Sequence, residues 1–308
     1  MESNVISVQL SGFEKYISVD TSSLSYAVSN GNYGGNQSWF YDENTEGIND
    51  LNSKVLRKGG CGVIASADSL IYLQKYNNRL KNKSIVENDV TKENLLFGDY
   101  DRFVRFMYNN YVTPTNVEES LQMYLSNGPL ILDKDKEMAS HVSDLITNGN
   151  GTYGLDPISI SNGLNHYLTD KTIDEIEYTY DYSDDYYDYK KVAKQIMRTL
   201  REDFPVILHI VGMTKLYSFE STYINTTYFH NLNILKIEQD TILDKTFVYC
   251  SSGSQKRKID LKECWNSIAY SDEVLGVGGH INVDSLIYTF KNSKHSIVYP
   301  VRTTYRGS

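Results

Sequence analysis

The pattern of apolar and polar positions changes along the chain from helical spacing to strand spacing. Between Cys61 and Asn77, apolar residues recur three and four positions apart with no proline among them, which predicts a helix. After Pro205 the apolar residues follow a strand pattern, beginning with a continuous aliphatic run over 206–211. Segment 3–28 also reads as extended. Further helices are predicted over 100–109, 116–126, 158–168 and 186–203, and further strands over 229–237, 246–250, 256–261, 281–290 and 296–301.

Helices followed by an antiparallel sheet are typical of the α+β fold class. No internal repeat and no Pro/Ser-rich linker divides the 308 residues, which contain 5 prolines, so we expect a single domain over 1–308. Within it we expect a helical lobe over about 61–203. A sheet lobe would be formed by about 1–60 and 204–308.

Charge and hydropathy exclude several classes of partner. Lys and Arg total 30 against 39 Asp and Glu, a formal net charge of −9 that disfavours nucleic-acid binding. No stretch reaches the roughly 18 unbroken apolar residues of a membrane span. The first residues show no basic-then-apolar leader pattern, so cytoplasmic residence is the default expectation. Export as an effector, or removal of a leader, is the alternative.

Metal and cofactor chemistry has no support in the sequence. The three cysteines, Cys61, Cys250 and Cys264, form neither a disulfide framework nor a Cys-x-x-Cys zinc pair. There is no His-Glu-x-x-His motif and no Walker A loop. The acidic run over 181–188 lacks the glycine and terminal glutamate of a calcium loop, so we interpret it as a solvated loop and helix start. We therefore expect no metal and no cofactor.

Cys61 lies where a polar, glycine-rich loop meets the predicted apolar helix, in the sequence Gly60-Cys61-Gly62. The N-terminus of a helix carries partial positive charge and unpaired N–H groups, which favour a thiolate and can hold a developing oxyanion. Flanking glycines allow close approach of a substrate. Cys61 is therefore the candidate nucleophile, although a buried cysteine can equally be a small core residue.

A thiol nucleophile needs a base, which is usually a histidine distant in sequence. His230 begins the strand predicted over 229–237 and is the first candidate. His280, which follows Gly278-Gly279, is the second. The next strand ends near Cys250 and Ser251, so either side chain could lie beside His230 and orient its ring. We expect His209 in the core, and His141, His166 and His295 at the surface.

These elements resemble the papain-like cysteine peptidases, and within them the bacteriocin-processing (C39-like) branch and its bacterial relatives. The resemblance is carried by short pieces scattered over roughly 30–265. They are Gly34-Gly35-Asn36-Gln37-Ser38-Trp39-Phe40, Gly59-Gly60-Cys61-Gly62-Val63-Ile64-Ala65, Pro205-Val206-Ile207-Leu208, His230 with its strand, and Phe247-Val248-Tyr249-Cys250-Ser251-Ser252-Gly253. It implies a helical lobe and an antiparallel sheet lobe with a cleft between them, Cys61 on one wall and His230 on the other.

The resemblance also implies a role for Gln37 as the side-chain donor to the oxyanion, with Asn52 as the fallback donor. Gln37 lies 24 residues before Cys61, a longer spacing than is common in papain-like enzymes. Two positions depart from the family pattern. The residue that orients the histidine is usually Asp or Asn but here falls on Cys250 or Ser251, and Ser252 stands where the family often has tryptophan.

We therefore expect a cysteine hydrolase, most simply a peptidase acting on a peptide or protein substrate through a thioester. Deamidation and acyl transfer use the same intermediate and are alternatives. A second alternative is a catalytically degenerate papain-like module that binds a partner. A third is carbohydrate binding through the 26 tyrosines, although a biased composition explains these equally well.

Overall fold

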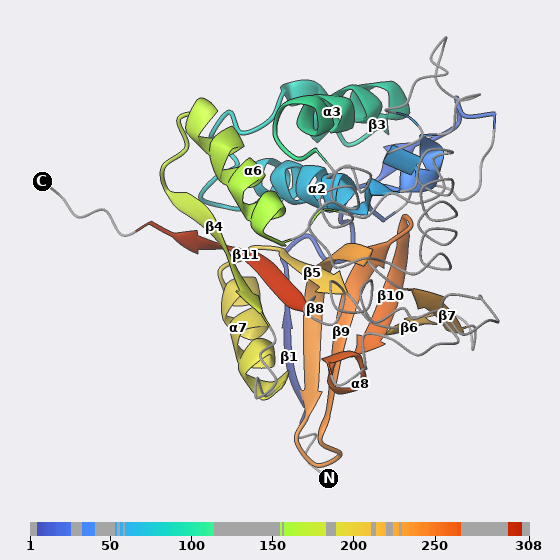
Figure 1. Cartoon of the computed structure of the whole chain (residues 1–308), viewed down its shortest axis with the longest axis vertical. Coiled ribbons are helices and arrows are strands. Elements are labelled where there is room, and N and C mark those ends of the chain that lie inside the picture. Colours follow the sequence, from blue (N-terminus) through green and yellow to red (C-terminus); the bar gives the residue numbers. More distant parts are fainter. Residues whose placement is uncertain are drawn as a thin grey trace, which may run out of the picture.

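The fold was analysed in a computed structural model of the chain (Figure 1). The structure describes residues 5–25, 33–40, 53, 56–57, 59–113, 155, 157–182, 189–210, 214–219, 224–227, 230–265 and 295–303. Mixed helix and sheet, with one large antiparallel sheet, confirms the expected α+β class at this level. None of the helices in these segments is both long and apolar enough to cross a membrane.

The large sheet has nine strands in the described part of the chain, and all of its pairings are antiparallel. Eight of the strands follow the order β4-β11-β5-β8-β9-β10-β6-β7, and the ninth, β1, pairs with β8. Their bounds are β1 Val5–Gln9, β4 Ile176–Tyr182, β5 Val206–Ile210, β6 Thr214–Ser218, β7 Ile224–Thr227, β8 His230–Asp240, β9 Lys245–Ser252, β10 Gln255–Asp260 and β11 Ser296–Arg302. A separate parallel pair joins β2 (Val19–Asp20) to β3 (Leu95–Leu96).

Strand β8 organises the sheet because it is long enough to pair with three neighbours. Its first half, from His230 to Ile234, pairs with β5, and its second half, from Lys236 to Asp240, pairs with β1. Along its other edge it pairs with β9, with a bulge between Ile234 and Lys236. Bulges re-aim a strand locally. The polar start of β8 is thus paired with β5 from His230, and with β9 from Asn233 onward.

Helix α2 (Cys61–Tyr76) packs against β8 and β5 and is the central helix of the fold (Figure 1). Its residues from Cys61 to Leu73 are all buried, because α3 and α6 cover it as well as the sheet. Helix α7 packs instead against β1, β8 and β11. The other helical bounds are η1 Gln37–Trp39, η2 Asn88–Thr91, α3 Phe97–Asn110, α6 Pro157–Asp170, α7 Tyr189–Arg201 and α8 Leu261–Trp265.

The predicted elements that fall on described residues are mostly confirmed. The helix predicted from Cys61 is α2, and those over 100–109, 158–168 and 186–203 are α3, α6 and α7. Strands β3, β4, β6 and β7 were not predicted. Because β4 and α7 both pack with the large sheet, the stretch expected to be a helical lobe contributes to the sheet region as well. The elements predicted over 116–126 and 281–290 lie outside the described residues.

Candidate active site

Cys61 is the first residue of α2, as predicted. Gly60 occupies the N-cap position but has no side chain to make a capping hydrogen bond, and the first turn contains no acidic residue. A Cβ at position 60 would lie 2.2 Å from the Leu56 carbonyl oxygen, so the close approach of these segments requires glycine. The thiol therefore lies at an uncapped helix N-terminus, where partial positive charge stabilises a thiolate.

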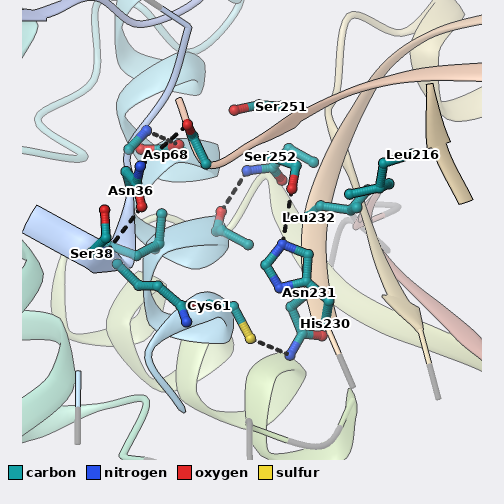
Figure 2. A pocket seen from close by; sticks show the side chains of 16 residues that line it. Asn36, Ser38, Cys61, Asp68, Leu216, His230, Asn231, Leu232, Ser251 and Ser252 are labelled. Carbon is teal, nitrogen blue, oxygen red and sulfur yellow. Dashed lines mark hydrogen bonds between the residues drawn. The ribbon is translucent and has the colours of Figure 1, made fainter. Parts of the chain in front are cut away.

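A pocket of about 300 Å³ opens at the start of α2 (Figure 2). Four segments line it: residues 35–38, the first two turns of α2, residues 230–233 of β8, and residues 251–253 at the end of β9, together with Leu216. The pocket therefore brings together Cys61, His230 and Gln37, although they are far apart in the sequence.

Among the described residues, the His230 ring makes one hydrogen bond, from Nε2 to Ser252 Oγ at 3.0 Å (Figure 2). Burial lowers the pKa of His230 to about 4, so the imidazole is neutral near pH 7. No hydrogen bond joins this ring to Cys61 in the described contacts. With Nε2 directed at Ser252, Nδ1 is the nitrogen that remains to accept a proton.

The side chain that contacts the Cys61 sulfur is that of Asn231, which directly follows His230 in the sequence. Asn231 Nδ2 lies 3.7 Å from Sγ and 3.1 Å from the Leu155 carbonyl oxygen, while Asn231 Oδ1 lies 2.9 Å from His209 Nδ1. Two residues further along β8, Asn233 Nδ2 donates to the Ala65 carbonyl oxygen of α2 at 2.9 Å. Successive side chains of a strand point to opposite faces, so 231 and 233 share the face that packs on α2.

Strand alternation also explains which residue meets the imidazole. The orienting side chain was expected to be Ser251 or Cys250, whereas the structure places Ser252 Oγ beside the imidazole. Ser251 pairs with Asn233 and its Oγ donates to the Tyr33 carbonyl oxygen at 2.6 Å. Cys250 is buried, with its sulfur directed at the Arg257 carbonyl oxygen. Ser252, one position later, shares a face with His230.

Gln37 reaches the pocket because its loop folds back onto α2 and β9. Gly35 N–H donates to the Asp68 carboxylate at 2.9 Å, and Asn36 Nδ2 donates to the Gly253 carbonyl oxygen at 3.2 Å. Gln37 Nε2 donates to the Arg57 carbonyl oxygen at 3.1 Å, while its buried Oε1 has no hydrogen-bond partner among the residues that the structure describes. The long spacing before Cys61 is thus accommodated. The fallback donor Asn52 lies outside the described residues.

Asp68 is a buried acidic group beside the pocket that the sequence reading did not single out. It lies two turns after Cys61 on α2 and is 1% exposed. Its carboxylate accepts from Gly35 N–H and, at 2.8 Å, from the Tyr100 hydroxyl. Burial outweighs these two donors and raises the pKa of Asp68 to about 7. The signal available in the sequence was a lone Asp within an otherwise apolar helix.

Of the histidines that the structure describes, only His230 lines the pocket. His166 is exposed near Asp170, as expected for a surface residue. The expectation that His295 is a surface residue is wrong, because it is 5% exposed and packs against Trp265. His209 is partly buried and reaches the site through Asn231. His141 and the second candidate base, His280, lie outside the described residues.

Cys61 and His230 are both uncharged near pH 7 in the absence of substrate. Burial raises the pKa of the Cys61 thiol, and hydrogen bonds from Asn231 and the backbone N–H groups of the helix start oppose that rise. Because burial lowers the pKa of His230, a pre-formed thiolate–imidazolium pair is disfavoured. Such a site suits proton transfer that occurs together with attack on a carbonyl.

In the comparisons with known proteins, neither a protein-family model nor a curated protein matches the chain. Among the described residues, no group of three or more His, Cys, Asp or Glu side chains is arranged to hold a metal ion.

Proposed function

We propose that the protein is a cysteine hydrolase that cleaves peptide or amide bonds. The observation that carries the proposal is the pocket in which Cys61, at an uncapped helix N-terminus, and His230, hydrogen-bonded to Ser252, share the lining. The resemblance to the papain-like peptidases, in their bacteriocin-processing branch, rests on these residues and their order along the chain. Membership of that family is therefore part of what we propose.

In the proposed reaction, Cys61 attacks the substrate carbonyl while Nδ1 of His230 accepts the thiol proton. The Nε2–H of the same ring donates to Ser252, which holds the tautomer needed for that transfer. The His230 imidazolium then returns the proton to the leaving amine, and water hydrolyses the thioester. The ring and the thiol must approach each other for this step, and hydrogen bonds of this kind commonly tighten when substrate binds.

The oxyanion would be held at the start of α2. The backbone N–H of Cys61 is one of the first four in the helix, so it has no partner within α2. Gln37 would be the second donor, because its Nε2 carries two protons and lines the same pocket. One of those protons is directed at the Arg57 carbonyl oxygen, so the side chain would donate the other.

A second candidate function is a binding module built on the same scaffold. One observation favours it: the Cys61 sulfur lies against the Asn231 amide and not against an imidazole. A thiol whose pKa is raised by burial is a poor nucleophile at neutral pH unless a base acts on it. In that case the pocket would bind a peptide without cleaving it.

Incubation with a mixed peptide library, read by mass spectrometry for new termini, separates the two functions. A hydrolase gives new termini that disappear in Cys61→Ala and persist in Cys264→Ala. Cys264 is the matched control because it is equally buried, and Thr214 Oγ1 lies 3.3 Å from its sulfur, away from the pocket. Cleavage that survives Cys61→Ala would refute the assignment. Peptide retention without cleavage would favour the binding module.

A further inference from the structure

We infer that Asn231 is a positioning residue that donates a hydrogen bond to the Cys61 sulfur and stabilises it as a thiolate. The inference rests on the proposed function for its purpose, but its geometry stands independently. Asn231 follows the candidate base directly in sequence, is 3% exposed, and lies on the face of β8 that packs against α2. Nothing in the sequence pattern distinguished Asn231 from the other residues of its strand.

The polarity of the Asn231 amide is fixed by its three neighbours. The Leu155 carbonyl oxygen can only accept, so the atom 3.1 Å from it must be the amide nitrogen. Oδ1 therefore faces His209, and because Oδ1 only accepts, His209 Nδ1 must carry a proton. The second proton of Nδ2 is left for Cys61 Sγ at 3.7 Å. The side chain thus presents a donor, not an acceptor, to the sulfur.

A donor at this point favours the charged form of the thiol. A thiolate accepts a stronger hydrogen bond than a neutral thiol, so an N–H directed at sulfur lowers the free energy of the thiolate more than that of the thiol. The amide is 3% exposed and is held in this orientation by the Leu155 and His209 contacts. The hydrogen bonds from Asn231 accordingly oppose the effect of burial on the pKa of Cys61.

Asn233 provides an internal comparison. It lies on the same face of β8, is 1% exposed, and donates from Nδ2 to a backbone carbonyl of α2, that of Ala65. Its role is therefore to attach the strand to the helix. Asn231 performs the same attachment to Leu155 but directs its remaining proton at a nucleophile. Room for it comes from Gly62, where a Cβ would lie 3.2 Å from Asn231 Nδ2.

The test is the rate of iodoacetamide labelling of Cys61 in the full chain between pH 6.5 and 11, read by peptide mass spectrometry. Asn231→Ala removes the donor, so we expect the midpoint of the rate profile to rise by about one pH unit and labelling at pH 7 to slow about tenfold. Asn231→Asp places a carboxylate beside the sulfur and should raise the midpoint further. Asn233→Ala, the matched control, should leave the midpoint unchanged.

The outcomes discriminate between a donor and a structural role. An unchanged midpoint in folded Asn231→Ala, or an equal shift in Asn233→Ala, overturns the inference. Asn231→Asp preserves size and the acceptor facing His209, so it covers the case in which the alanine variant fails to fold, and a midpoint at the wild-type value there also overturns it.

Failure of the proposed function gives a different signature. Labelling reports the thiol alone, so a midpoint shift in a protein that cleaves no peptide supports the Asn231 role and contradicts the hydrolase. Cys61-dependent cleavage with no midpoint shift supports the hydrolase and removes Asn231 from it.

Discussion

The two walls of the pocket are held in different ways, and this difference bears directly on how the site can be changed. On the helix wall, α2 is buried over its first thirteen residues, and Asp68 ties it to the Gly35 loop. On the strand wall, the register of β8 and β9 brings His230 beside Ser252 and the following residue, Asn231, against the Cys61 sulfur in the same pocket. Packing fixes the first wall, and strand register fixes the second.

Among substitutions in the strand wall, removal of the proposed base His230 should have the largest effect on peptide cleavage. His230→Ala leaves Cys61 in place but removes the Nδ1 acceptor, so kcat/KM for peptide cleavage should fall by about 10²–10⁴-fold. The measurement is cleavage of a peptide found in the library screen. His166→Ala, at an exposed histidine remote from the pocket, is the control and should match wild type. Loss of less than tenfold in His230→Ala would assign the base elsewhere.

The helix wall should respond chiefly through stability. A Cβ on Gly35 would lie 1.8 Å from the Tyr100 hydroxyl oxygen, which is hydrogen-bonded to Asp68. Gly35→Ala must therefore displace the loop or the tyrosine, and we expect a loss of about 3 kcal/mol in the free energy of unfolding.

Gly98→Ala is the matched control for that substitution. A Cβ on Gly98, in α3, would meet nothing within 4 Å, so this variant should be neutral or more stable by up to about 1 kcal/mol. Urea unfolding of both variants gives the comparison. Equal stability of the two would mean that the Gly35 loop is not held against α2.

Asp68 makes the stability of the helix wall depend on pH. Its pKa is about 7 in the folded protein, above the value of 3.8 for an unperturbed Asp. Between these values the unfolded chain releases a proton that the folded chain retains, so stability present below about pH 4 is lost as the pH rises toward 7. Asp68→Asn removes this titration. Raising the pH from 4 to 7 should therefore destabilise wild type relative to the variant, by about 2–4 kcal/mol.

Urea unfolding of both proteins at pH 4, 5.5 and 7 measures this difference. The asparagine keeps an acceptor for Gly35 N–H, and the Tyr100 hydroxyl can reverse to accept from the new amide. Parallel pH profiles for the two proteins would contradict a carboxyl held neutral by burial.

The same contrast explains what the sequence could predict. Apolar residues recur at helical spacing along α2, so the helix and the place of Cys61 at its start could be predicted from the sequence. For β8 the spacing predicted a strand. The side chains can be assigned to faces only when the first residue of the strand and its register with its neighbours are known. The bulge between Ile234 and Lys236 and the pairing with β9 supply that register, and neither is visible in the residue pattern.

Long-range contacts account for the other differences. Asp68 reads as an interruption of an apolar helix until Gly35 and Tyr100 are seen to donate to it. Strand β4 joins the sheet by pairing with β11, and α7 packs against β1 and β8, so both placements depend on residues distant in the sequence. The local pattern contains no information on such pairings.

The smallest effect we predict tests the register of the strand wall directly. Ser252→Ala removes the partner of His230 Nε2 and should lower kcat about tenfold, because the ring loses its preferred tautomer and orientation but keeps Nδ1. Ser251→Ala removes the bond to the Tyr33 carbonyl oxygen on the opposite face, so it should lower the unfolding free energy by about 1 kcal/mol and leave the pH profile of kcat unchanged. A reversed pair of results would mean that β9 is shifted by one residue against β8, which would turn Ser251 toward the imidazole.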